Sequence, residues 1–170
     1  KVIFPNFPAL NSSIKIDVAF KVYSSIDELE GKVKDLMLEA VEIRKKAYAP
    51  YSKFRVGAAI LLESGRIITG SNQENAAYPS GLCAERTAIF YAGANFPNEK
   101  ILAIAISACS DLKITNGPIP PCGSCRQSMF EYEVKQETSI KLFCMGGVGE
   151  VIESDSVGNI LPFHFDKSVL

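Results

Sequence analysis

The sequence has little net charge and no long apolar run, and each absence excludes a class of protein. Lysine and arginine number 18 and the acidic residues 19, a net charge of −1 over 170 residues. Nucleic-acid binding usually shows as a basic excess, so we expect no nucleic-acid partner. No apolar stretch approaches the roughly 20 residues of a membrane helix, and residues 1–10 lack the apolar core of a signal peptide. We therefore expect no membrane association.

Histidine is scarce, and the cysteines do not suggest a disulfide framework. His164 is the only histidine, and the number of cysteines, five, is odd. Three cysteines cluster in two short motifs, while Cys109 and Cys144 lie apart in apolar runs. Thiols kept reduced for metal binding fit a cytoplasmic protein better than a disulfide-linked secreted one. We therefore expect a cytoplasmic location and a metal site built from sulfur.

The order of predicted elements indicates an α/β fold. Apolar spacing and loop signals predict helices at 25–47, 83–94 and 122–135. Strand patterns are found at 54–62, 67–73, 101–108, 139–145 and 150–153. Alternation of strands and helices forms a mixed sheet with helices on both faces. The prediction is a three-layer sandwich around a mixed five-stranded central sheet.

Two signals set the predicted start of the domain. Ser25 and Glu28 have the spacing of a capping box, so the first helix is expected to begin there. Before it, apolar and polar side chains alternate over residues 14–22, which is a strand pattern. We expect residues 1–24 to be an extension whose strand joins the sheet edge or reaches a neighbouring subunit. Residues 25–170 are expected to form a single domain, with a short closing helix from Ser156.

The two cysteine motifs predict a zinc site. Cys122 and Cys125 are three residues apart at a helix start, so both sulfurs face one side, and Cys83 begins another helix. Helix N-termini stabilise thiolates, and two of them directed at one point form a zinc pocket. Three protein ligands leave the fourth tetrahedral position free, as in catalytic zinc sites. A structural zinc and three unrelated buried cysteines are the less favoured alternatives.

Charged residues beside the cysteines are candidates for roles around the metal. Three thiolates leave the zinc site with a net charge of about −1. Arg86, three residues after Cys83, is predicted to hydrogen-bond the sulfurs and draw off charge. Arg126 is predicted to occupy a solvated helix position. Glu85 lies two residues after Cys83, so spacing alone does not bring it to the metal; the irregular first turn of the helix has to do so.

With these motifs established, the sequence resembles the cytidine deaminase family in its small homotetrameric form. The similarity extends over about residues 36–165. Cys-x-Glu followed by Pro-Cys-x-x-Cys marks the wider group of zinc deaminases. The stretches 49–59, 70–78 and 161–165, found in the same order, narrow the resemblance to this family. One departure is His164, which stands where a small residue is expected.

The resemblance implies a role for each matching residue. Cys83, Cys122 and Cys125 are expected to bind Zn²⁺, and Glu85 to carry protons. A carboxylate and an amide that alternate along a strand also suit a sugar diol. The residues implied to contact the nucleoside are Phe54 on the pyrimidine ring, Asn72 and Glu74 on the ribose hydroxyls, the backbone of Ala84 on the base, and Phe165 and Tyr78 in a neighbouring subunit's pocket.

The implied activity is zinc-dependent hydrolytic deamination of cytidine and deoxycytidine to uridine and deoxyuridine, as in pyrimidine salvage. The expected partners are a small nucleoside substrate and three further copies, in a homotetramer with shared active sites. Three alternatives stay open: a deaminase of a cytosine-containing antibiotic such as blasticidin S, a polynucleotide-editing deaminase, and a zinc-stabilised binding module without catalysis. The low net charge and the Asn72–Glu74 pair disfavour the polynucleotide enzyme.

Overall fold

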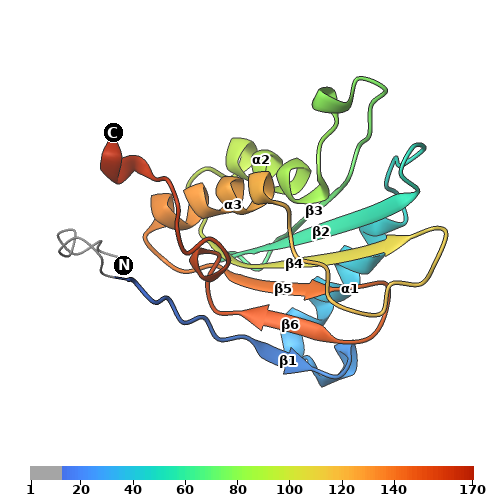
Figure 1. The fold of residues 1–170 in the computed structure, drawn as a ribbon, viewed down its shortest axis with the longest axis horizontal. Coiled ribbons are helices and arrows are strands. Elements are labelled where there is room, and N and C mark those ends of the chain that lie inside the picture. The colour runs from blue at the N-terminus through green and yellow to red at the C-terminus, as the bar shows by residue number, and fades with distance from the viewer. Residues whose placement is uncertain (1–12) are drawn as a thin grey trace.

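A computed structural model describes residues 13–170, and its centre is a six-stranded mixed sheet (Figure 1). The strands run in the order β1-β6-β5-β4-β2-β3. Only β4 and β5 are parallel; the other neighbours are antiparallel. The bounds are β1 Lys21–Tyr23, β2 Phe54–Leu62, β3 Ile67–Ser71, β4 Ile101–Ser110, β5 Lys141–Met145 and β6 Val151–Ser154. The sheet has one strand more than predicted because β1 joins its edge.

Three α-helices cover the two faces of the sheet, which confirms the three-layer sandwich. Helices α2 (Ala84–Asn95) and α3 (Gly123–Gln136) lie on one face, and α1 (Gly31–Arg44) lies on the other (Figure 1). Central strand β4 contacts both layers, since alternate side chains point to opposite faces. Its isoleucines Ile104 and Ile106 pack with α2 and α3, while Ala103 and Ala105, which alternate with them, pack with α1.

The first helix begins later than predicted. The Ser25 hydroxyl accepts from the Asp27 amide at 3.1 Å and the Glu28 carboxylate accepts from the Ser24 amide at 2.8 Å, so Ser25 is an N-cap without the full capping box, and it caps a short 3₁₀ helix, Ile26–Glu28. The chain is extended again at Leu29, and Gly31, with a φ of +52°, begins α1. Ser25 was therefore correctly predicted as an N-cap, whereas the reciprocal capping box and the helix type were wrong. The closing helix expected from Ser156 is likewise one 3₁₀ turn, Gly158–Ile160.

The extension forms a strand only at its end. Residues Lys21–Tyr23 pair with β6, whereas residues 13–20 have no regular structure. A buried carboxylate anchors this strand: Glu153 accepts from Tyr23 Oη at 2.5 Å, Lys141 Nζ at 2.7 Å and Lys21 Nζ at 3.2 Å. The predicted edge strand is therefore present, in a shorter form.

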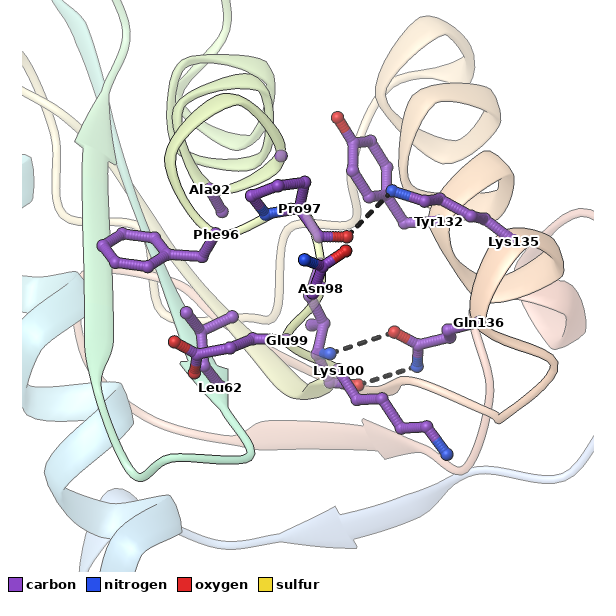
Figure 2. A pocket seen from close by; sticks show the side chains of 12 residues that line it. Leu62, Ala92, Phe96, Pro97, Asn98, Glu99, Lys100, Tyr132, Lys135 and Gln136 are labelled. Atoms are coloured by element: carbon purple, nitrogen blue, oxygen red, sulfur yellow. Dashed lines mark hydrogen bonds between the residues drawn. The ribbon is translucent and has the colours of Figure 1, made fainter.

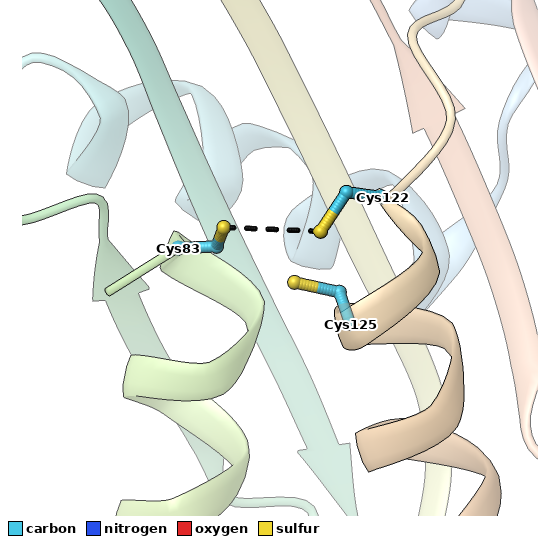
Figure 3. Close-up of side chains that lie close together, drawn as sticks. All are labelled: Cys83, Cys122 and Cys125. Atoms are coloured by element: carbon cyan, nitrogen blue, oxygen red, sulfur yellow. Dashed lines mark hydrogen bonds between the residues drawn. The ribbon is translucent and has the colours of Figure 1, made fainter. Parts of the chain in front are cut away.

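Helices α2 and α3 lie side by side with their N-termini at the same end (Figure 3). A cavity of about 190 Å³ lies between their C-terminal ends, where Phe96, Tyr132 and Lys135 contribute to its wall (Figure 2). The three motif cysteines stand at the other end, at the N-termini. Among residues 13–170, no helix combines the length and apolar character needed to cross a membrane.

Candidate metal centre and active site

Three cysteine sulfurs meet between the N-termini of α2 and α3 (Figure 3). Cys83 directly precedes α2, Cys122 directly precedes α3, and Cys125 lies in the first turn of α3. The Cys83 and Cys122 sulfurs are 4.0 Å apart, and all three lie within 4.8 Å of one another. Sulfurs around a tetrahedral Zn²⁺ are about 3.8 Å apart, given a Zn–S bond of about 2.3 Å. Elsewhere in residues 13–170, no other His, Cys, Asp and Glu side chains converge in this way.

One of the three thiols, Cys83, holds negative charge even before a metal is considered. A hydrogen bond from the Cys125 thiol, supported by one from Arg86, lowers the pKa of Cys83 to about 5. The proton stays on Cys125, because the same hydrogen bond and burial raise the pKa of Cys125. Helix N-termini further favour thiolates. A soft donor set of three sulfurs, one of them a thiolate, fits Zn²⁺.

Arg86 makes the contact that its spacing predicted. Its Nη2 donates to the Cys83 sulfur at 3.6 Å, and this bond raises the pKa of Arg86. Its Nε is buried without a partner among the described residues. The guanidinium therefore places a fixed positive charge against the Cys83 thiolate.

Glu85 is the buried carboxylate of the site. Only 5% of it is exposed, and this burial, with the negative charge of Cys83, raises its pKa. The helix that carries it approaches β3 closely: a Cβ on Gly70 would lie 2.7 Å from the Ala88 amide nitrogen and 2.8 Å from the Ala84 carbonyl oxygen. The first turn of α2 thus rests directly on the sheet. A carboxyl with a raised pKa is suited to proton transfer near neutral pH.

A pocket of about 520 Å³ opens beside Cys83 and Arg86. Glu74 projects into it and is held by the amides of Tyr51, at 2.9 Å, and Ser52, at 3.3 Å, and by the Ser52 hydroxyl. The hydroxyl bond is the main reason that the pKa of Glu74 is lowered, so this carboxylate is charged. Among residues 13–170, the only cation in the pocket wall is Arg86, and it is turned toward sulfur. The pocket therefore suits a neutral ligand rich in hydroxyl groups.

Asn72 lies in this pocket but not at the predicted strand end. Strand β3 stops at Ser71, so Asn72 and Glu74 belong to the following loop, and both line the pocket. The Asn72 side chain accepts from the Val56 amide at 2.8 Å and donates to the Phe54 carbonyl at 3.0 Å. It therefore clamps the start of β2, a role that the sequence did not reveal.

Of the other predicted contact residues, Tyr78 lines the pocket, whereas Phe54, Ala84 and Phe165 do not. Tyr78 lines the pocket of its own chain, with its ring edge-on to Tyr51 at 6.1 Å. Ala84 is fully buried at the start of α2. Phe54 is half-buried on β2 and is outside the pocket wall, as is Phe165, which is 59% exposed. A contact of Phe165 with a neighbouring subunit stays a prediction.

Two functional contacts escaped the sequence reasoning. Ser52 belongs to a recognised motif, yet nothing in its neighbours indicates that it holds Glu74.

The prediction that Arg126 occupies a solvated helix position is wrong, because the residue is half-buried and donates to two backbone carbonyls. His164 packs its ring on Phe130, with centroids 4.2 Å apart, so it is no candidate fourth ligand.

Sequence comparison agrees with this geometry. The family model for the cytidine and deoxycytidylate deaminase zinc-binding region matches residues 31–139. The chain belongs to this family. A cytidine deaminase of Halalkalibacterium halodurans is 41% identical over 130 residues, which cover 76% of this chain and 91% of the relative. One of Sporosarcina psychrophila is 40% identical over 139 residues, covering 81% and 94%. Family membership makes the chain a zinc-dependent hydrolytic deaminase.

Solved structures support the same assignment. A cytidine deaminase structure from Burkholderia pseudomallei aligns with a TM-score of 0.66 and 40% identity, covering 77% of this chain and 97% of that one. The cytidine deaminase structure from Mycobacterium tuberculosis aligns with a TM-score of 0.61 and 28% identity, covering 81% and 99%. The deaminase fold therefore accounts for nearly all of those chains and leaves part of this one outside the match.

Proposed function

We propose that this deaminase converts cytidine and deoxycytidine to uridine and deoxyuridine in pyrimidine salvage, in the cytoplasm. One observation carries the proposal: a three-thiol cluster, a buried carboxyl and a pocket with a charged acceptor occur at one place. The cluster fits zinc, the carboxyl fits proton transfer, and the acceptor fits a sugar hydroxyl. The curated relatives with the same family domain are named cytidine deaminases.

In this proposal Cys83, Cys122 and Cys125 hold Zn²⁺. Zinc bound there supplies the Lewis acidity that makes water a nucleophile near neutral pH. Three thiolates weaken that acidity by their charge, and Arg86 offsets part of it through its bond to the Cys83 sulfur. The same bond fixes the orientation of the sulfur.

Glu85 carries the protons. It takes a proton from the attacking water and passes it to ring nitrogen N3 while the water oxygen bonds to C4. It then carries the second proton to the amino group, the C4–N4 bond breaks, and ammonia leaves. The buried position of Glu85 suits both roles, because a raised pKa lets one carboxyl accept and return a proton. Its burial from water also strengthens the charge interactions of this carboxyl.

Binding of the nucleoside is assigned to the pocket residues and their neighbours. A carboxylate has about four acceptor positions. Glu74 uses three of them on Tyr51 and Ser52, which leaves one for a ribose hydroxyl. Asn72 keeps one free N–H and one free lone pair for the same sugar. The proposed contacts with the base are Phe54 and the backbone of Ala84, and Tyr78 is assigned, with Phe165, to the pocket of a neighbouring subunit.

The proposed assembly is a homotetramer in which active sites are shared. The supporting observation is that Phe165 is exposed and lies outside the pocket of its own chain. A neighbouring copy could supply this aromatic ring to close the pocket over the substrate. Exclusion of water by a closed pocket is a usual requirement for charge-based catalysis.

An absorbance assay with four substrates tests this function. We expect loss of the cytosine chromophore with cytidine and deoxycytidine, and no turnover of blasticidin S or single-stranded DNA, with about one zinc per chain by atomic absorption. Turnover of blasticidin S or of single-stranded DNA without turnover of either nucleoside would show that the proposed substrate is wrong. Zinc without turnover of any substrate would indicate a binding module.

A further inference from the structure

The part of the loop that leads directly to Cys122 has few backbone N–H groups with which to fix its position. It contains Pro118, Pro120 and Pro121, and proline has no backbone N–H to donate. Cys125 is fully buried in α3, whereas Cys122 is exposed and lies at the junction of loop and helix. The position of the Cys122 sulfur therefore depends on what holds the residue before it.

Arg126 supplies that contact. Its Nε donates to the Pro121 carbonyl at 2.8 Å, directly before Cys122, and its Nη1 donates to the Ile160 carbonyl at 3.0 Å. The guanidinium borders a mainly apolar cavity of about 450 Å³ that Pro121 and Ile160 also line. Charged donors in apolar surroundings form strong hydrogen bonds, and a planar guanidinium can serve two acceptors at fixed angles.

The second carbonyl belongs to the segment that leads to Phe165. The next residue of α3, Gln127, holds the same segment further along, because its Nε2 donates to the Phe165 carbonyl at 2.9 Å. Two adjacent side chains at the start of α3 thus anchor the C-terminal segment to the helix that bears two of the three sulfurs.

We propose that Arg126 is a positioning residue that holds Cys122 at ligand distance and links the metal loop to the segment carrying Phe165. The inference rests on the proposed zinc role of Cys122. Loss of Arg126 frees both segments at once: zinc leaves faster because one of its ligands is mobile, and substrate binds less well because Phe165 is less fixed.

The test compares Arg126→Gln and Arg126→Lys with the wild type, using zinc transfer to a chromogenic chelator. Lys135→Gln is the matched control, because Lys135 is a cation of the same helix that donates to a loop carbonyl, Pro97, at the far end (Figure 2). We expect Arg126→Gln to lose zinc at least about tenfold faster, as for one lost charge-assisted hydrogen bond. Arg126→Lys, which can serve one carbonyl, is expected to be intermediate, and the control unchanged.

Two further readouts separate positioning from plain stability. Trypsin is expected to cut after Lys167 faster in both Arg126 variants than in the wild type. The KM for cytidine is expected to rise in both variants, while kcat in saturating zinc changes less than about twofold. Zinc transfer at the wild-type rate in Arg126→Gln, or in folded Arg126→Lys if the glutamine variant does not fold, overturns the inference. A wild-type protein that binds no zinc overturns the proposed function instead.

Discussion

Glu85 is a carboxyl group that the fold removes from water, and its role depends on that removal. Burial and the adjacent thiolate both raise its pKa. We expect Glu85→Gln and Glu85→Ala to keep the fold and the zinc but to lose about 10³-fold in kcat, the usual size of an acid–base contribution. Steady-state kinetics, melting temperature and zinc content measure the three quantities. Turnover within tenfold of the wild type excludes the proton-carrying role.

Single residues also show why the metal ligands could be predicted and their surroundings could not. Cys122 and Cys125 share a helix start, so their spacing alone places both sulfurs together. Glu85 is buried on a helix that packs closely on Gly70, which is distant in the sequence. Arg126 could not be predicted either, because its carbonyl partners come from irregular segments whose path depends on the complete fold.

At the scale of elements, the contact between α2 and β3 positions the site. A methyl group on Gly70 would meet backbone atoms of α2 at 2.7 and 2.8 Å, and a backbone cannot rotate away. We expect Gly70→Ala to displace the first turn of α2, to cost about 1–3 kcal/mol of stability as overpacking does, and to weaken zinc binding and turnover in the folded protein. Chemical unfolding and chelator competition measure these effects.

The matched control lies at the other end of the same helix. A methyl group on Gly93 would meet the tip of the Tyr132 side chain, which borders the small cavity between α2 and α3 and can move (Figure 2). Gly93→Ala is expected to cost stability but to leave zinc affinity unchanged. Equal losses of zinc affinity in both variants would show that Gly70 acts only through overall stability.

The pairing of β1 with β6 makes stability depend on pH. Burial alone raises the pKa of Glu153, but hydrogen bonds from Lys141, Tyr23 and Lys21 outweigh it and hold the pKa at about 2, against an ordinary 4.5. Because the folded pKa is the lower one, the stabilisation is complete above about pH 4.5 and is lost as the pH falls toward 2. Both lysines are about half exposed, so solvent screens their attraction for Glu153. We therefore expect this carboxylate to contribute about 2 kcal/mol to the free energy of unfolding at neutral pH, which is less than the pKa shift alone would give.

Urea unfolding at several pH values tests this dependence at fixed protein concentration. At pH 7 we expect Glu153→Gln to be less stable than the wild type by about 2 kcal/mol. The difference in the free energy of unfolding is expected to shrink as the solution is acidified toward pH 3. Asp155→Asn is the control, since this exposed carboxylate meets the same lysines at 3.6 and 3.7 Å and is expected to contribute little. A difference that persists unchanged at pH 3 would contradict the assigned pKa.

Most elements could be predicted because their signals are local. The apolar run of β4 and the hairpin of β2 and β3 were confirmed, since alternation and turn residues determine them. The beginning of α1 and the length of β1 were not, because they depend on tertiary contacts. β1 forms where Lys21 and Tyr23 reach Glu153, and residues 14–20 show the same alternation without pairing.

At the scale of the whole molecule, the open question is whether one chain completes the active site of another. Glu85 and the thiols belong to one chain, while the exposed Phe165 is the proposed contribution of its neighbour. In that case a Glu85→Gln chain and a Phe165→Ala chain have complementary defects. The first lacks the proton carrier and the second lacks the ring that closes the neighbouring pocket.

Co-expression of the two variants distinguishes shared from separate sites. In a randomly mixed homotetramer, about a quarter of all sites combine Glu85 of one chain with Phe165 of the other, so activity is expected to approach a quarter of the wild-type value. The control is the same mixture prepared from separately assembled proteins that do not exchange subunits. If the sites are complete within each chain, co-expression cannot create an intact one, and its activity equals the mean of the two variants measured alone.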